Sequence, residues 1–276
     1  MPAAQRVTTQ ETATWGAVPT LRDEALRLVR RASERKLTLR ITGSLGVLLR
    51  CPSAAGLLET LGRRPLRDID LMAYAKEQPA IEALFGEENW TLDPVIRWSR
   101  EWGVRRLIYT SSDGRFKVDV FLDQLVMSHT IDMRRRLALE TPTIPLVDLV
   151  LSKLQIHEIT QNDLLDTIVL LAEHGLGDGG ADTIERRRLV DVLSDDWGFW
   201  YAARTNLDRA EAALEACGGL PPDVVPAVRG RIAEIRDSVD AAPKSRRWRL
   251  RSAVGTRLAW YQEVDEVERG EGSEPV

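Results

Sequence analysis

The hydrophobic pattern of the chain changes in character close to residue 140, from mixed helical and strand-like segments to almost wholly helical ones, and this change limits the folds open to it. Before that point, short stretches alternate apolar and polar residues at every second position, which is typical of half-buried strands. After it, apolar residues recur almost only at helical spacing. Pro142 and Pro145 break the chain at the change. We therefore predict an α/β (α+β) domain over residues 1–140 and an all-helical domain over residues 141–276.

The N-terminal half contains the signals of a small mixed sheet flanked by helices. Apolar residues share one helical face at Leu21, Ala25, Leu28 and Ala32. An alternating segment, 37–42, then runs into Gly43-Ser44-Leu45-Gly46, where we expect a turn into a helix. Further on, Ser112-Asp113-Gly114 separates two strand-like runs, and an Asp-Gly pair in that place favours a β-hairpin.

Three aspartates fall on strand-like segments in positions that can bring them together. Asp68 and Asp70 are separated by one residue, so their side chains leave the strand on the same face. Asp119 lies in the second strand of the expected hairpin and joins them if the two strands are neighbours. Asp123 has the same parity, but its place at the strand end favours a turn or cap role. Carboxylate oxygens suit Mg²⁺, and phosphoryl transfer commonly uses two such ions about 3.5–4 Å apart.

The order of these motifs resembles the signature of polymerase-beta superfamily nucleotidyltransferases: Gly43-Ser44, then Asp68-Ile69-Asp70, then Asp119 within Lys117-Val118-Asp119-Val120-Phe121. The resemblance implies a palm domain in which Gly43 and Ser44 hold the β- and γ-phosphates of an NTP. It also implies that Asp68 and Asp70 bind two Mg²⁺ ions and that Asp119 helps to activate the acceptor hydroxyl. From Ser44 to Asp68 is 24 positions, longer than the compact family pattern. Residues 51–67 are therefore expected to be an insertion or a lengthened helix and loop.

A second match follows the proline boundary. The segment Leu151-Ser152-Lys153-Leu154-Gln155, followed by Asn162-Asp163 and Asp166, is similar to the lysine-then-aspartate helices of abortive-infection and type IV toxin nucleotidyltransferases. By that resemblance, Lys153 contacts the triphosphate and Asp163 orients the lysine.

The resemblance implies transfer of an NMP from the NTP to an acceptor hydroxyl, with release of pyrophosphate. The acceptor stays open between an RNA 3′ end, a protein hydroxyl and a small molecule such as an aminoglycoside. One interpretation is that the protein is the toxin of a toxin-antitoxin pair, that it modifies tRNA, and that an antitoxin is its partner. The alternative, from another class, is a non-catalytic nucleotide-binding or partner-binding protein that keeps the palm fold.

Composition and charge indicate the cellular compartment and the kinds of partner to expect. The formal net charge of -4 gives no global attraction to nucleic acid, so any such contact needs a local patch. Cys51 and Cys217 match neither a disulfide framework nor a zinc pattern, which fits a reducing cytosol and makes a structural metal unexpected. Residues 1–16 lack the apolar core of a signal peptide, and no segment approaches membrane-spanning length. We expect a cytoplasmic protein with no membrane partner.

Two further groups of residues favour structural roles. The histidines show no ligand spacing and are expected to be structural or surface residues: His129, His157 and His174. The basic run 244–251 contains an aromatic residue and could face RNA. Trp248, Leu250 and Val254 favour instead an apolar helix face with the charges on its solvent side.

Overall fold

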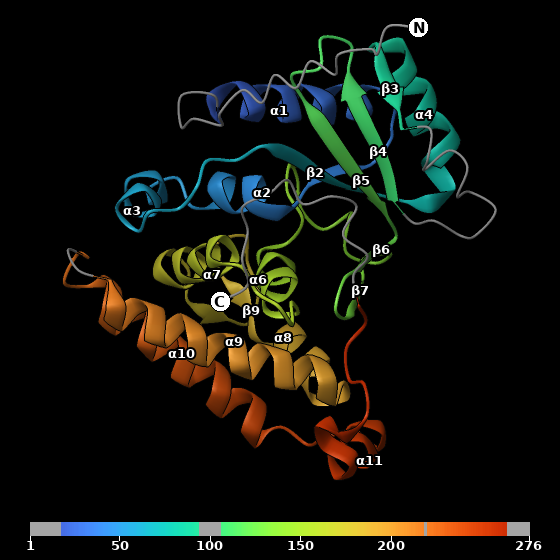
Figure 1. The fold of residues 1–276 in the computed structure, drawn as a ribbon. Coiled ribbons are helices and arrows are strands. Elements are labelled where there is room, and N and C mark those ends of the chain that lie inside the picture. Colours follow the sequence, from blue (N-terminus) through green and yellow to red (C-terminus); the bar gives the residue numbers. More distant parts are fainter. Residues whose placement is uncertain (1–17, 94–105, 218–219, 264–276) are drawn as a thin grey trace, which may run out of the picture.

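The computed structural model describes residues 18–93, 106–217 and 220–263. Its centre is a five-stranded sheet with the order β1-β2-β5-β4-β3 (Figure 1). The strands, in that order, are Leu39–Ile41, Asp68–Ala73, Lys117–Leu122, Arg106–Ser111 and Trp90–Leu92. The β2 and β5 strands run parallel, whereas the other neighbouring pairs are antiparallel. The fold is therefore a mixed α/β one with a small mixed sheet, as predicted.

One face of this sheet is covered by α1 (Val18–Glu34) and α4 (Gln78–Glu87) (Figure 1). The α1 helix forms there because its apolar residues repeat at helical spacing, and Leu21, Ala25, Leu28 and Ala32 are all buried, as expected. They pack in one core with apolar residues of β2 and β5, including Ile69 and Val118. A short 3-10 helix, η2 (Ala75–Glu77), leads into α4.

The predicted hairpin is present, because β4 and β5 pair across the turn that contains Asp113 and Gly114. Gly114 has a φ of +71°, a left-handed conformation that glycine adopts without steric cost. Side chains then alternate along β5: Val118 and Val120 enter the core beneath α1, whereas Phe121 packs in a second core on the opposite face. Asp119 leaves the strand on that second face.

The second half of the chain is mainly helical, as predicted, although it is not all-helical, because the short strands β8 (Leu176–Gly177) and β9 (Ile184–Glu185) pair within it. Its helices are α6 (Leu146–Leu154), α7 (Gln161–Glu173), α8 (Arg186–Asp195), α9 (Trp197–Ala216), α10 (Val224–Ala241) and α11 (Arg246–Val254), with the 3-10 helix η4 (Gly255–Arg257). Two small sheets accompany them: β6 (Gln124–Val126) with β7 (Thr130–Asp132), and β8 with β9. In the described part of the chain, no helix is long and apolar enough to cross a membrane.

Two helices connect the sheet to the helical part. They are α2 (Gly43–Arg50) and α3 (Ala54–Thr60), which lie between β2 and the α6–α7 pair (Figure 1). The core of the helical part therefore includes Val47 and Leu58 from these helices, and Met72 and Phe121 from the sheet. The long connection 51–67 is α3 followed by a loop, in agreement with the expected helix and loop. The aspartate-bearing face of the sheet is thus directed toward the helical half.

The expected apolar face of α11 is wrong. Leu250 is 75% exposed, and no residue of α11 is buried. The physical reason is that arginines surround this helix, so it has no continuous apolar stripe to bury. Trp248 contacts the body of the protein through its ring, which lies 5.2 Å from the ring of Trp200.

Candidate active site

The three predicted aspartates lie on neighbouring strands. Asp70 and Asp119 are direct register partners in the parallel β2–β5 pair, and Asp68 pairs with Lys117 two positions earlier. Because all three share one strand parity, their side chains leave the same face of the sheet. Asp68 is exposed and Asp70 half-buried, whereas Asp119 is only 5% exposed. The fold therefore places three carboxylates at one end of the β2–β5 pair.

These carboxylates repel one another in the metal-free protein. Desolvation raises the pKa of Asp70 to about 7, and the negative charges of Asp119 and Asp68 add to the effect. Desolvation also raises the pKa of Asp68, although the nearby charge of Lys117 acts against it. A site that disfavours its own negative charges is one that a bound cation would relieve.

Gly43 brings the N-terminus of α2 against this group. Its φ is +61°, and a Cβ placed on it would lie 2.1 Å from Oδ2 of Asp70. No other residue fits there without moving the carboxylate, which explains why the turn after β1 needs glycine. The backbone N–H of Thr42 also donates to the carbonyl of Asp70 at 2.9 Å. The first turn of α2, whose amides lack intrahelical partners, is thus fixed beside the aspartates, where an anion is favoured.

Ser44 and Lys153 meet on the helical side of the same turn. The Lys153 amine donates to Oγ of Ser44 at 3.2 Å and to Oδ1 of Asp163 at 2.8 Å. It also lies 2.9 Å from Oδ2 of Asp166. Burial alone would lower the pKa of Lys153, but the charges of Asp163 and Asp166 more than offset this and raise it. The lysine is therefore a permanent cation that is 5% exposed and held at the junction of α2, α6 and α7.

Two further residues complete this junction: Asp166, which the sequence motif included without assigning it a role, and Arg63, which the sequence prediction missed. Asp166 is fully buried and accepts hydrogen bonds from Ser44 at 2.6 Å and from Nε of Arg63 at 2.6 Å. Arg63, which comes from the loop after α3, is 3% exposed. The spacing of Asp163 and Asp166, three positions apart on one helix, is the signal that could have assigned Asp166 to the same face as Asp163. Nothing in the sequence pairs Arg63 with it, because 103 positions separate the two residues.

The donor set fits a divalent hard cation. Asp119 has a buried oxygen, Oδ1, that finds no hydrogen-bond partner among the described residues. Its other oxygen accepts a short hydrogen bond from Nη2 of Arg106. A buried carboxylate oxygen without a partner is costly, and a metal ion would satisfy it. Carboxylates from two adjacent strands are the oxygen ligands that Mg²⁺ prefers.

Asp123, which has the same strand parity as Asp119, has a role in the turn after β5. It has a φ of +61° at the end of β5, and its Oδ1 accepts a hydrogen bond of 3.0 Å from the backbone N–H of Ala75. This is the turn role that its position at the strand end favoured.

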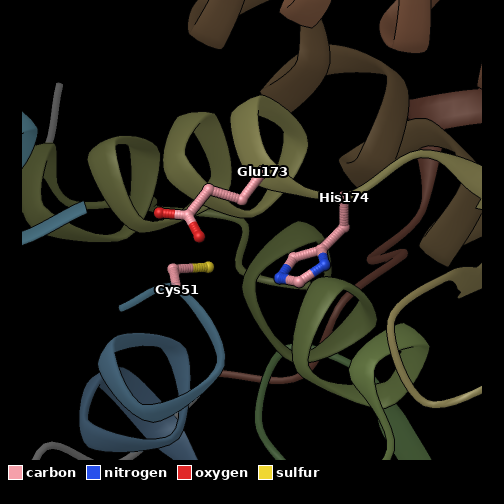
Figure 2. Close-up of side chains that lie close together, drawn as sticks. All are labelled: Cys51, Glu173 and His174. Carbon is pink, nitrogen blue, oxygen red and sulfur yellow. The ribbon is translucent and has the colours of Figure 1, made fainter. Parts of the chain in front are cut away.

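A separate cluster joins Cys51, Glu173 and His174, whose potential ligand atoms all lie within 4.8 Å of one another (Figure 2). Sequence analysis did not bring these residues together, because they come from the C-terminal ends of α2 and α7. The two ring nitrogens of His174 contact the carbonyls of Arg50 at 2.9 Å and Asp182 at 3.2 Å, so neither is free for a metal. Burial also raises the pKa of the Cys51 thiol, which disfavours the thiolate. We interpret the cluster as packing between two helix ends.

The other two histidines are packed among aromatic rings. His129 stacks on Phe199 with ring centroids 5.2 Å apart, and His157 stacks on Tyr261 at 3.8 Å. Desolvation lowers the pKa of His129 to about 4. Gln262 donates its backbone N–H to Ser128 at 2.9 Å, which holds the C-terminal segment against the β6–β7 turn. Structural roles for these histidines agree with the expectation from their spacing.

Comparison with known proteins gives little further information. No protein-family model matches the chain, and no curated protein matches it either. Among solved structures, the chain is similar to the solution structure of the antibiotic-resistance factor ANT(2'')-Ia. The match covers 81% of this chain and 99% of that one, with 14% identity and a TM-score of 0.33. A likeness at this level says nothing of activity.

Proposed function

We propose that this protein is a Mg²⁺-dependent nucleotidyltransferase that moves an NMP from an NTP to an acceptor hydroxyl and releases pyrophosphate. The observation that carries the proposal is the register of Asp70 and Asp119, with Asp68 two positions before Asp70 and the N-terminus of α2 packed against the carboxylate of Asp70. Carboxylates and a helix N-terminus at one place suit a nucleotide that arrives with its cations.

Each group has a defined task in this proposal. Asp68, Asp70 and Asp119 would hold two Mg²⁺ ions, which supply charge neutralisation for the phosphates and acidify the acceptor hydroxyl. Asp119 lies deepest and directs the acceptor oxygen toward the α-phosphorus. The turn at Gly43 and Ser44 binds the β- and γ-phosphates through backbone amides. Lys153, held by Asp163, supplies a fixed positive charge to the triphosphate.

Ser44 needs a change of partner for this task. Its hydroxyl donates to Asp166 of the helical half at 2.6 Å, so it faces away from Asp68, Asp70 and Asp119. The amides of the same turn bind phosphate without this change, and Ser44 Oγ also accepts from Lys153. We therefore assign the serine mainly to linking Lys153 with the phosphate-binding turn.

The first experiment identifies the acceptor of the NMP group. The purified full chain is incubated with each α-³²P-labelled NTP, Mg²⁺ and total cell extract, and the label is traced into RNA, protein and small molecules. Label in one fraction identifies the acceptor class, and label in tRNA would support a toxin-like activity. The matched control is Asp70→Asn, which should give no transfer.

A binding measurement separates the enzyme from a non-catalytic relative. NTP with Mg²⁺ should raise the melting temperature, corresponding to about 2.7 kcal/mol at a hundredfold excess over Kd. Neither component alone should reproduce the shift. A full shift without transfer to any acceptor would favour the non-catalytic nucleotide-binding protein. Equal shifts with and without divalent cation would contradict the proposed site.

A further inference from the structure

Arg106 is held against the deepest of the three carboxylates. It is the first residue of β4, and its Nη2 donates a short hydrogen bond to Oδ2 of Asp119. Its guanidinium also lies over the ring of Phe121, with 5.3 Å between Cζ and the ring centroid. Phe121 is the register partner of Arg106, so the sheet itself fixes this contact. Arg106 is therefore built into the strand pair that carries Asp119.

The charge of Arg106 acts on all three aspartates. It forms an ion pair with Asp119, and it also acts against the desolvation that raises the pKa of Asp68 and of Asp70. The side chain of Asp119 is 7% exposed and that of Arg106 is 32% exposed, so the pair lies at the edge of the buried region. Arg106 is thus a counter-charge that contacts Asp119 and acts on Asp68 and Asp70 through space.

This pairing leaves both partners incompletely satisfied. Within the described ranges, Oδ1 of Asp119 and Nε of Arg106 are buried and have no hydrogen-bond partner. The guanidinium therefore uses one oxygen of the carboxylate and leaves the other for a second cation. A divalent cation at that oxygen would repel the guanidinium, because unit charges a few ångström apart interact by several kcal/mol at a protein surface.

We propose that Arg106 neutralises Asp119 in the metal-free protein and gives up this contact when a divalent cation binds, so that it sets the metal affinity of the site. The inference rests on the proposed function, because it needs Asp119 to be a metal ligand. It adds a positioning residue on β4 that competes with the cation. Its physical basis is an exchange of one counter-charge for another at the same carboxylate.

The test is titration of the metal-free full chain with Mn²⁺ alone at pH 8, read by isothermal calorimetry and by the loss of free Mn²⁺ signal in electron paramagnetic resonance. Arg106→Gln should bind Mn²⁺ more tightly than the wild type. Lys117→Gln is the matched control, since it removes the same charge beside Asp68 without a bond to Asp119. The Mn²⁺ affinity of Arg106→Gln should exceed that of this control by about fivefold, because a partly exposed ion pair contributes a free energy equivalent to about that factor.

A second readout uses stability and needs no turnover. Without metal, Arg106→Gln should melt below the wild type, because Asp119 loses its counter-charge. Saturating Mn²⁺ should then stabilise Arg106→Gln more than the wild type. If this variant fails to fold, Arg106→Lys replaces it in the Mn²⁺ titration. Its ammonium keeps the charge but lacks the planar contact with Phe121, so Mn²⁺ should displace it more easily and bind more tightly than to the wild type. Arg106→Gln combined with Asp119→Asn should restore folding, because residue 119 is then no longer an unpaired carboxylate.

The outcomes separate this inference from the proposed function. Mn²⁺ binding to the wild type, with Arg106→Gln no tighter than Lys117→Gln, would overturn the role of Arg106 and leave the metal site intact. Absence of Mn²⁺ binding in all variants would refute the metal site, and the inference would fall with it. Mn²⁺ binding about fivefold tighter in Arg106→Gln than in Lys117→Gln would support the exchange.

Discussion

The Cα of Gly43 lies so close to the carboxylate of Asp70 that a Cβ there would be 2.1 Å from Oδ2. This contact fixes the N-terminus of α2 beside the candidate metal ligands. We predict that Gly43→Ala destabilises the fold by roughly 2–4 kcal/mol, because it adds this clash to the strain of a left-handed backbone. It should also abolish metal-dependent NTP binding. Chemical denaturation and the Mg²⁺–NTP thermal shift measure the two effects.

Gly62 provides the matched control for this substitution. Its φ is +70°, similar to that of Gly43, but a Cβ placed on it would have no described neighbour within 4 Å. Gly62→Ala therefore measures backbone strain alone, about 1 kcal/mol, and should leave NTP binding unchanged. Equal losses of stability in the two variants would show that the contact with Asp70 does not restrict residue 43.

The carboxyl of Asp70 predicts a pH dependence in the metal-free protein. Its pKa in the folded state is about 7, above the value of 3.8 for a free carboxyl, so the native state keeps a proton that the unfolded chain has lost. Stability contributed by this group therefore falls as the pH rises from about 4 through 7. Asp70→Asn should remove this dependence and be more stable than the wild type at pH 8 by roughly 2 kcal/mol.

Urea denaturation in EDTA across this pH range measures the effect, and transfer activity is followed in parallel. Asp68→Asn is the comparison, since Asp68 is exposed and should change stability less. Both variants should lose transfer. Near-normal turnover in either variant would show that these aspartates are not the metal ligands.

The buried amine of Lys153 should matter for both folding and nucleotide binding. Lys153→Ala leaves Asp163 and Asp166 without one cation, and we expect a loss of about 3 kcal/mol in stability. It should also weaken NTP binding strongly while Mn²⁺ binding stays close to that of the wild type. Lys153→Arg should rescue NTP binding only in part, because a planar guanidinium does not fit the space of an ammonium. Calorimetric titration of each ligand measures these effects.

Asp163→Asn separates the structural role of this ion pair from the nucleotide role. It removes one partner of Lys153 at 2.8 Å but keeps the amine, which Asp166 still holds at 2.9 Å. Stability should fall, whereas NTP affinity should change only a few-fold. A folded Lys153→Ala protein that binds NTP as tightly as the wild type would make Lys153 a purely structural residue.

His129 predicts a second pH dependence of stability, opposite in direction to that of Asp70. Its pKa is about 4 when folded, below the 6.5 of a free imidazole, because desolvation disfavours the charged ring. The unfolded chain binds a proton first, so stability falls as the pH drops from about 6.5 toward 4. Between pH 7 and pH 5 the loss should be roughly 2 kcal/mol, and His129→Gln should abolish it.

His157→Gln should reduce this slope only in part, because the charge of His157 contributes to the lowered pKa of His129. Trp260, whose ring centroid lies 6.0 Å from that of His129, contributes a signal from this region to the tryptophan fluorescence of the protein. Because Asp70 contributes a change of opposite sign over this range, the test is the difference in stability between the wild type and His129→Gln. The same difference at pH 7 and at pH 5 would contradict the assignment.

Local sequence patterns were sufficient for most of the secondary structure. The alternation in β2 and β5 assigned the faces of Asp70 and Asp119 correctly, since a strand has only two sides. The helical spacing at Leu21 and Ala25 likewise predicted the buried face of α1. The pattern failed at α11, where Leu250 is exposed, because a short helix rich in arginine takes its position from neighbouring elements.

Local patterns in the chain were enough to place three aspartates on strands of matching parity, a Gly-Ser turn before a helix, and a helical half after residue 140. Three features came to light only in the folded protein: β2 and β5 are parallel neighbours, Gly43 packs on Asp70, and Arg106 pairs with Asp119. The physical reason is that parity and helical period are local properties of a chain. Strand order, buried ion pairs and close backbone contacts depend on packing between segments far apart in sequence.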